Sequence, residues 1–254
     1  YGLLFFDSIF QLSFGHNIVG LKYINESNFR ITSFFGKDEV LGSYTARLFP
    51  FLIFLIFNNC NNQNKKYYLY FSILSALTIC VISGERTSLF LYLISFGCFA
   101  VFLNDNRKYF LRSIFFSIII FVLAFTLEPR IKNRMVNQTL EQIGLKDAKK
   151  LKVFSETYEG HYKIALKMFI EKPLFGHGTR MFRKYCAKKE NFIQDHACTT
   201  HPHNIYMQAL SENGLVGFLI IFSLYLYLLY LLLKSFYFRF FRKIQIYSDQ
   251  YLAL

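Results

Sequence analysis

The sequence predicts an all-α protein, a transmembrane helical bundle that crosses the bilayer several times and carries one large, partly helical external loop. Hydrophobic residues make up 54% of its 254 residues, and charged residues make up 18%, below the roughly 25% of a typical soluble domain. Several apolar runs approach or reach the roughly 17 to 25 residues that a membrane-spanning helix needs. The composition excludes a disordered chain and a disulfide-rich scaffold.

Five apolar stretches are expected to form the membrane helices. A helix in a soluble core would show a polar stripe, whereas no charge interrupts residues 113–126 or 214–233. The first three stretches are shorter, or are interrupted by glycine, serine and Arg47. The five expected spans are residues 41–57, 68–83, 87–103, 112–127 and 214–233.

Basic residues in short loops indicate which end of each span faces the cytoplasm. Lys and Arg gather in residues 58–67, 104–112 and 234–243, and five crossings place these three loops on one face. The opposite face then receives the first 40 residues, the turn at residues 83–87 and a long polar segment. We therefore expect three parts: residues 1–127 with membrane helices and the first external loop, residues 128–213 as the large external loop, and residues 214–254 with a membrane helix, a basic cytoplasmic loop and the start of a further helix.

The chain ends and the net charge add two expectations. The chain starts at Tyr1, and its last four residues open another apolar run, so we expect a fragment that lacks terminal helices. The formal net charge of +13 is compatible with nucleic acid, anionic lipid or an anionic substrate. Because the basic residues flank apolar runs, we expect a membrane partner and no nucleic acid.

Two of the five cysteines, Cys186 and Cys198, belong to the external segment. In an oxidising compartment they would form one disulfide that closes a small loop. Two unrelated thiols are the alternative.

Side chains able to exchange protons near neutral pH gather in the external segment, which contains five of the six histidines. There, residues 158–170 have the period of an amphipathic helix, and Pro173, Gly176 and Gly178 end it in a turn. The densest cluster follows, from Cys198 to Gly214. The five histidines are His161, His177, His196, His201 and His203.

His203 is the candidate base of this cluster. We expect Thr200 or His201 to cap a helix with Pro202 and His203 in its first turn. The positive end of the helix dipole would then keep the His203 imidazole neutral and able to accept a proton. The alternative is that His203 only caps or packs. Four metal-ligand types lie within eight residues, but they match no common zinc spacing and we expect no metal: His196, Cys198, His201 and His203.

Arg86 is the second anchor, because an arginine in a turn on the external face runs against the usual charge bias. Its guanidinium could grip a diphosphate at the membrane surface through two parallel hydrogen bonds, or it could pair with Glu85. Three further arginines could share the task or remain solvated charges: Arg30, Arg180 and Arg183.

Four segments together resemble the O-antigen ligase and O-antigen polymerase superfamily. Residues 160–178 read GHYKIALKMFIEKPLFGHG, and residues 203–217 read HNIYMQALSENGLVG. The turn SGERT at residues 83–87 and the segment RITSFFGKDEVLG at residues 30–42 are also similar to that group. The resemblance spans most of the chain, and the His-Asn segment is its most specific part.

The resemblance implies a multi-pass glycosyltransferase of the C-type architecture in a bacterial inner membrane, with its large loop in the periplasm. It implies a polyprenyl-diphosphate-linked glycan as donor, and either lipid A core or a second lipid-linked glycan as acceptor, with no cofactor. His203 would be the base, Arg86 would contact the diphosphate, and Asn204 and Glu212 would bind substrate.

One departure from the family pattern concerns the second cation. Tyr158 and Tyr162 stand where members often carry Arg and Trp, so Arg180 or Arg183 would have to supply that charge, or it is missing. Two other classes remain open: a transporter or flippase of the same lipid-linked glycan, and an accessory membrane protein that only binds a partner.

Overall fold

The structure is a computed structural model that describes residues 1–22, 29–103, 107–142, 156–191, 193 and 197–242. Regular structure in these residues is helical, apart from an isolated bridge between His16 and Lys22. The chain folds into two compact units, residues 1–139 and the described residues between 140 and 242. The predicted all-α class is confirmed for this part of the chain. The three-part division at residues 127 and 213 stays a prediction.

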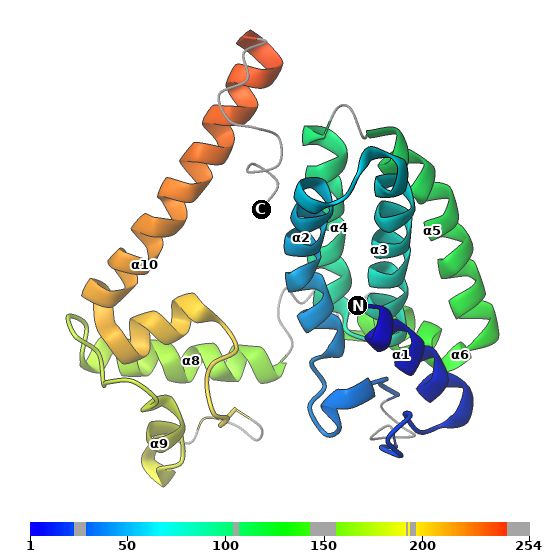
Figure 1. Cartoon of the computed structure of the whole chain (residues 1–254). Helices are drawn as coiled ribbons and strands as arrows, with labels where there is room; N and C mark the ends of the chain where they lie inside the picture. The colour runs from blue at the N-terminus through cyan, green and yellow to red at the C-terminus, as the bar shows by residue number, and fades with distance from the viewer. Residues whose placement is uncertain (23–28, 104–106, 143–155, 192, 194–196, 243–254) are drawn as a thin grey trace. The chain divides into compact units, whose positions relative to one another are not determined.

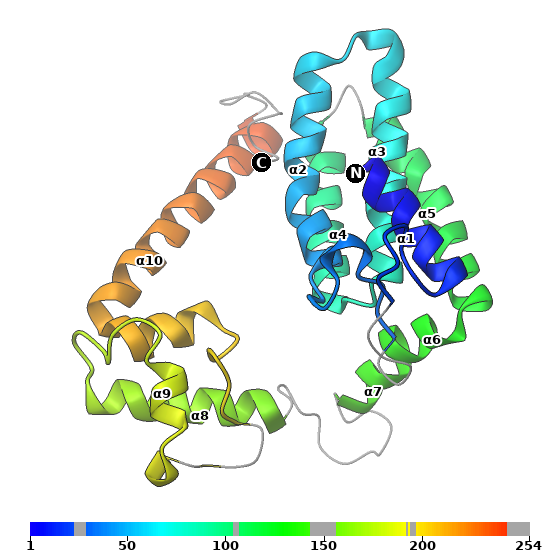
Figure 2. The ribbon, with the colours of Figure 1, turned by 60° about the horizontal axis from the view of Figure 1, so that its bottom comes forward.

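The first unit is a bundle of four long helices with a shorter helix against it (Figure 1). Helices α2 and α3 pack on each other, α4 packs on both, and α5 packs on α3 and α4, while α1 lies against α3 (Figure 2). The buried core is aromatic and aliphatic, and it includes Phe49, whose ring centroid lies 4.9 Å from that of Tyr92. The bounds are α1 Gly2–Phe14, α2 Leu41–Asn59, α3 Asn62–Ile82, α4 Arg86–Phe102 and α5 Arg107–Leu127.

Within the described residues, four helices are long and apolar enough to cross a membrane: α2, α3, α5 and α10 (Ile205–Tyr237). Helix α4 is also apolar but has 17 residues. Each of the five predicted stretches therefore corresponds to a helix, and the ends differ by up to nine residues, most at the start of α10. The multi-pass membrane prediction is confirmed by these helices.

Buried polar groups hold the segment between α1 and α2 onto α1. Gln11 accepts hydrogen bonds from the backbone N–H groups of Thr32 and Ser33, at 3.0 and 2.7 Å. Asp7 accepts from the hydroxyl of Ser33 and from the N–H of Ile18. Because a buried polar group without a partner costs about 1–3 kcal/mol, this network fixes the loop against the bundle.

The second unit packs α8 (Glu156–Glu171) and α9 (Phe182–Cys186) against the start of α10. Its small core includes Ile164, Met168 and Phe182. The predicted helix over residues 158–170 corresponds to α8, but its buried face is not the expected one: His161, Ile164, Ala165 and Met168 are buried, whereas Leu166 and Ile170 are exposed.

Helix α10 breaks at Gly214, whose φ of 66° and ψ of −167° are not helical. The break frees backbone groups, and the turn after α8 satisfies them. The N–H groups of Leu215 and Val216 donate to the carbonyls of Pro173 and Leu174, at 2.7 and 3.2 Å. In return, the N–H of Gly178 donates to the carbonyl of Glu212, at 2.8 Å.

Glycine is required on both sides of this contact. A Cβ on Gly214 would lie 2.4 Å from the carbonyl group of Leu174, and a Cβ on Gly176 would lie 2.4 Å from that of Glu212. Both glycines also have positive φ, which disfavours a side chain. The glycines at positions 176 and 214 therefore allow the turn after α8 to contact the backbone of α10 at its break.

We predict that Gly176→Ala or Gly214→Ala destabilises the protein by about 2 kcal/mol or more, because each adds backbone strain and a clash. The measurement is thermal unfolding of the purified full chain in detergent, with an expected fall in Tm of at least about 4 °C. Gly97→Ala is the matched control, since a Cβ there meets nothing within 4 Å. Equal Tm values for the three variants would contradict this account of the break.

Candidate active site

The turn between α3 and α4 presents Arg86 as the first residue of α4. Gly84 makes this turn with a φ of 67°. The side chain of Glu85 points back to the start of α2, where its two oxygens accept from the N–H groups of Gly42 and Ser43, at 2.8 and 3.0 Å. Burial raises the pKa of Glu85, while these two hydrogen bonds and the charge of Arg30 lower it. Glu85 thus serves as the cap of α2 and fixes the turn.

Arg86 and Arg30 each have a partner within the first unit. Nη1 of Arg86 donates to the hydroxyl of Thr139 at 3.0 Å. Nη1 of Arg30 lies 2.6 Å from Oε2 of Glu39, and both side chains are partly exposed. The two arginines predicted from the sequence in this unit are therefore held in place and retain access to solvent.

The structure adds Arg134, which the sequence analysis missed. After the short α6 (Pro129–Lys132), the π-helical turn η3 (Asn133–Asn137) carries Arg134 with 5% of its surface exposed. Its Nε donates to the carbonyl of Gly84 at 3.0 Å. Burial lowers the pKa of Arg134, and the charges of Arg30 and Arg86 lower it further, so three guanidinium groups share one region.

A local signal for Arg134 exists in the sequence. Glu128 and Pro129 form a helix start, with the Glu128 carboxylate accepting from the N–H of Arg130. One turn later, Ile131 and Arg134 lie three residues apart and therefore on one face. Ile131 is fully buried, so Arg134, which lies on the same face, is buried as well.

His203 precedes α10, and the predicted helix start is wrong. Asn204 is the cap, and its Oδ1 accepts from the N–H groups of Tyr206 and Met207, at 2.9 and 3.2 Å. Asparagine is among the strongest caps, so it takes the position expected for Thr200 or His201. His203 therefore lies outside the first turn, with a φ of 53°.

The side chains around His203 form a cluster of three imidazoles and one phenol, which we call the histidine cluster: His161, His201, His203 and Tyr158. The ring of His203 lies 4.3 Å from that of His201 and 5.4 Å from that of His161, between centroids. Tyr158 of α8 lies 6.0 Å from His203. His161 is buried, and its Nδ1–H donates to the carbonyl of Ala197 at 2.6 Å.

These neighbours determine the protonation of His203. Partial desolvation lowers the pKa of the His203 ring, and the nearby His201 and His161 lower it further. The helix dipole, invoked from the sequence, is not the cause, because the residue lies before the helix. A neutral His203 can accept a proton from a hydroxyl group.

A disulfide joins Cys186 at the end of α9 to Cys198, with 5.3 Å between the Cα atoms. It links α9 to the segment that leads to His201 and His203 of the histidine cluster. Among the described His, Cys, Asp and Glu side chains, no group of three or more is arranged to hold a metal ion. His196, part of the metal alternative, lies outside the described residues.

Residues 71–222 match the O-antigen ligase family. The chain belongs to this family. The matched region contains both Arg86 and His203 and covers more than half of the chain. A search of curated proteins finds no match. Membership places the chain in surface polysaccharide assembly, and the apolar helices make it a multi-pass membrane protein of that family.

Two residues predicted to bind substrate have structural roles in this member of the O-antigen ligase family. Asn204 caps α10. Glu212 has 3% of its surface exposed, and its carboxylate accepts from the N–H of Phe182 at 3.1 Å and from Nε2 of Gln208 at 3.0 Å. It therefore caps α9 from within the core.

Arg180 and Arg183 are exposed residues of the second unit, one before α9 and the other within it. Arg86 belongs to the first unit. Their role as the second cation stays a prediction.

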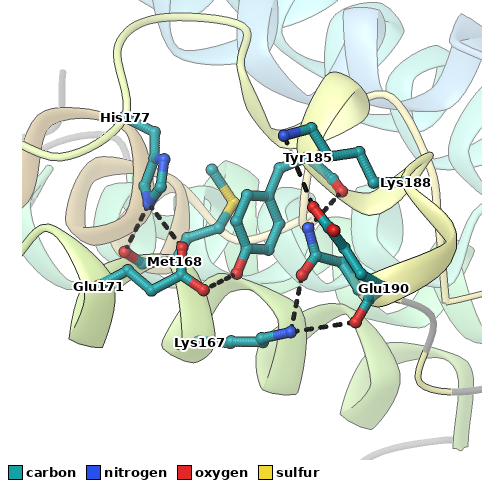
Figure 3. A network of polar contacts seen from close by, with 8 residues as sticks. Lys167, Met168, Glu171, His177, Tyr185, Lys188 and Glu190 are labelled. Atoms are coloured by element: carbon teal, nitrogen blue, oxygen red, sulfur yellow. Dashed lines mark hydrogen bonds and ion pairs between the residues drawn. The ribbon is translucent and has the colours of Figure 1, made fainter.

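His177 belongs to a separate network that holds α8, α9 and the turn η4 (Lys189–Asn191) together (Figure 3). Its Nε2 donates to the carbonyl of Met168 at 3.0 Å, and the hydroxyl of Tyr185 donates to Glu171. Burial and Glu171 raise the pKa of Tyr185. This histidine therefore packs the unit and takes no part in the histidine cluster.

We predict that the His203 imidazole titrates below its ordinary pKa of 6.5, so that it is mostly neutral at pH 6.5. Because the unfolded chain binds that proton more tightly, the folded state loses stability as the pH falls below about 6.5. The measurement is an NMR titration of labelled histidines, with His203→Gln to assign the signal.

The variant His201→Gln should raise the midpoint of His203, because it removes a neighbouring imidazole. His16→Gln, in the first unit, should leave the midpoint unchanged. A His203 midpoint at or above 6.5 in the unsubstituted protein would contradict the proposed neutral base.

Proposed function

We propose that this protein transfers a glycan from a polyprenyl-diphosphate carrier to an acceptor hydroxyl, as an O-antigen ligase or polymerase. The observation that supports it most is the presence of two chemistries on family-matched segments, one in each unit. One unit carries guanidinium groups at a helix hairpin, and the other carries a neutral imidazole beside a membrane helix.

The proposed reaction needs a base and a stabilised leaving group. His203 takes the proton of the acceptor hydroxyl, whose oxygen forms a bond to the anomeric carbon of the glycan. The bond from that carbon to the carrier phosphate breaks, and its electrons leave with the diphosphate. Guanidinium groups stabilise the negative charge that develops there, a contribution plausibly worth about 10²-fold or more.

The positions of the basic residues support this proposal separately in each unit. In the first unit, the basic residues at the starts of α3 and α5 lie at the bundle end away from Arg86. In the second unit, Lys234 and Arg239 lie near the C-terminal end of the α10 and η5 segment, away from His203. If these basic ends face the cytoplasm, both functional groups face the periplasm of a bacterial inner membrane.

An apolar groove in the first unit fits the carrier's hydrocarbon tail. It lies between α1, α3 and α5, has a volume of about 560 Å³, and its lining includes Ile82, Glu128 and Ile131. Ile82 is two residues from Gly84, so the lining includes a residue next to the turn that presents Arg86. Sites for small ligands usually have about 300–1,000 Å³, which would accommodate a segment of the chain rather than all of it.

We predict that His203→Ala and Arg86→Ala each lower glycan transfer by about 10²-fold or more, because each removes one of the two chemistries. The measurement is transfer in vitro from a purified polyprenyl-diphosphate-linked glycan. His16→Ala and Arg107→Ala are the controls, because both residues are exposed and belong neither to the histidine cluster nor to the arginine group of Arg30, Arg86 and Arg134. Full transfer by both active-site variants would refute the assignment of these residues.

The acceptor added to the same assay separates the two reactions. A ligase would extend lipid A core, whereas a polymerase would lengthen a second lipid-linked glycan.

We predict that Thr87 and Lys188, one from each unit, lie on the same side of the membrane. The measurement is labelling of Thr87→Cys and Lys188→Cys by a membrane-impermeant maleimide in spheroplasts, after replacing the free cysteines Cys60, Cys80 and Cys98 with serine. Both positions should react before permeabilisation, and a Lys65→Cys control should react only after it. Labelling of Thr87 and Lys188 from opposite sides would exclude a shared site.

A further inference from the structure

We infer that Arg134 is a positioning residue of the proposed diphosphate site at the turn between α3 and α4, where it acts behind Arg86 and Arg30. The inference rests on the proposed function and assigns the second cation that the sequence left open. It places that cation in the first unit, on η3, rather than at Arg180 or Arg183.

Gly84 makes the contact with Arg134 possible. A Cβ on Gly84 would lie 2.8 Å from Cδ of Arg134 and 3.1 Å from its Nε. Without that Cβ, the Nε–H reaches the Gly84 carbonyl at 3.0 Å. Arg134 therefore fixes the backbone of the turn two residues before Arg86.

The charges around this turn favour an anion. The ionised side chains that act on Arg134 electrostatically are two arginines and two glutamates, so with Arg134 itself positive groups outnumber negative ones. Glu39 pairs with Arg30, and Glu85 caps α2. One positive charge therefore remains in excess, which favours binding of an anion, and burial of Arg134 strengthens its field.

Exposure assigns the roles within the site. Arg134 has 5% of its surface exposed, whereas the Arg30 side chain has 22% exposed, and Arg86 is partly exposed. Arg86 and Arg30 can therefore reach phosphate oxygens from solvent. Arg134 acts through the turn and through its charge. Two phosphate groups suit two accessible guanidinium groups, each able to make paired hydrogen bonds.

The test is calorimetric binding of inorganic diphosphate to the full chain in detergent. We expect Arg134→Gln to weaken binding about tenfold, since it removes the charge and the Nε–H. Arg134→Lys should weaken binding about threefold, since it keeps the charge and loses the contact with Gly84. Arg107→Gln, at the other end of the bundle, should bind as the unsubstituted protein does. Inorganic phosphate should bind about tenfold more weakly than diphosphate.

The outcomes separate this inference from the proposed function. If Arg86→Gln weakens binding but both Arg134 variants bind normally, Arg134 is only structural and the inference fails while the proposed function stands. If Arg183→Gln weakens binding and Arg134→Gln does not, the second cation lies in the second unit.

If the unsubstituted protein binds no diphosphate, the proposed donor site itself fails. Equal affinity for inorganic phosphate would overturn the diphosphate class. Should Arg134→Gln not fold, Arg134→Lys decides, because normal binding by that variant contradicts positioning through Gly84.

Discussion

A break in a helix must satisfy the backbone groups that it frees, and this constraint organises the second unit. At Gly214 the helix α10 turns, and the segment Pro173–Gly178 supplies and receives the hydrogen bonds that the helix no longer makes. The contact is backbone against backbone, so glycine is needed on both sides. It fixes the start of α10 against α8, and with it the loop that carries His203.

The first unit solves a related problem at the turn between α3 and α4. The Glu85 side chain of this turn accepts a hydrogen bond from the N–H of Gly42 at the start of α2. The carbonyl of Gly84 accepts one from Arg134. In both units a glycine with positive φ brings a backbone close to a partner distant in sequence. Residues that determine the fold therefore lie beside those proposed for chemistry, such as Arg86.

The membrane helices were predictable because the requirement is compositional: a span must be apolar over its whole length. Helix α8 was predictable because its apolar residues recur with the period of an α-helix, which is also a local property of the sequence. The start of α10 was not, because Thr200, His201 and Asn204 are all candidates to cap it, and only Asn204 accepts hydrogen bonds from the N–H groups two and three residues later. Because the helix begins after Asn204, His203 lies outside it, and its pKa is lowered by burial and neighbouring histidines rather than by the helix dipole.

The sequence by itself determined the apolar helices, the membership of a membrane family and the chemical groups available for transfer, since these follow from residue type and local order. Tertiary structure decided which groups meet. Arg134 contacts Gly84 across 50 positions, and the buried Glu212 accepts from the N–H of Phe182 across 30. Such contacts depend on how helices pack, and the packing is set by many side chains together rather than by any motif.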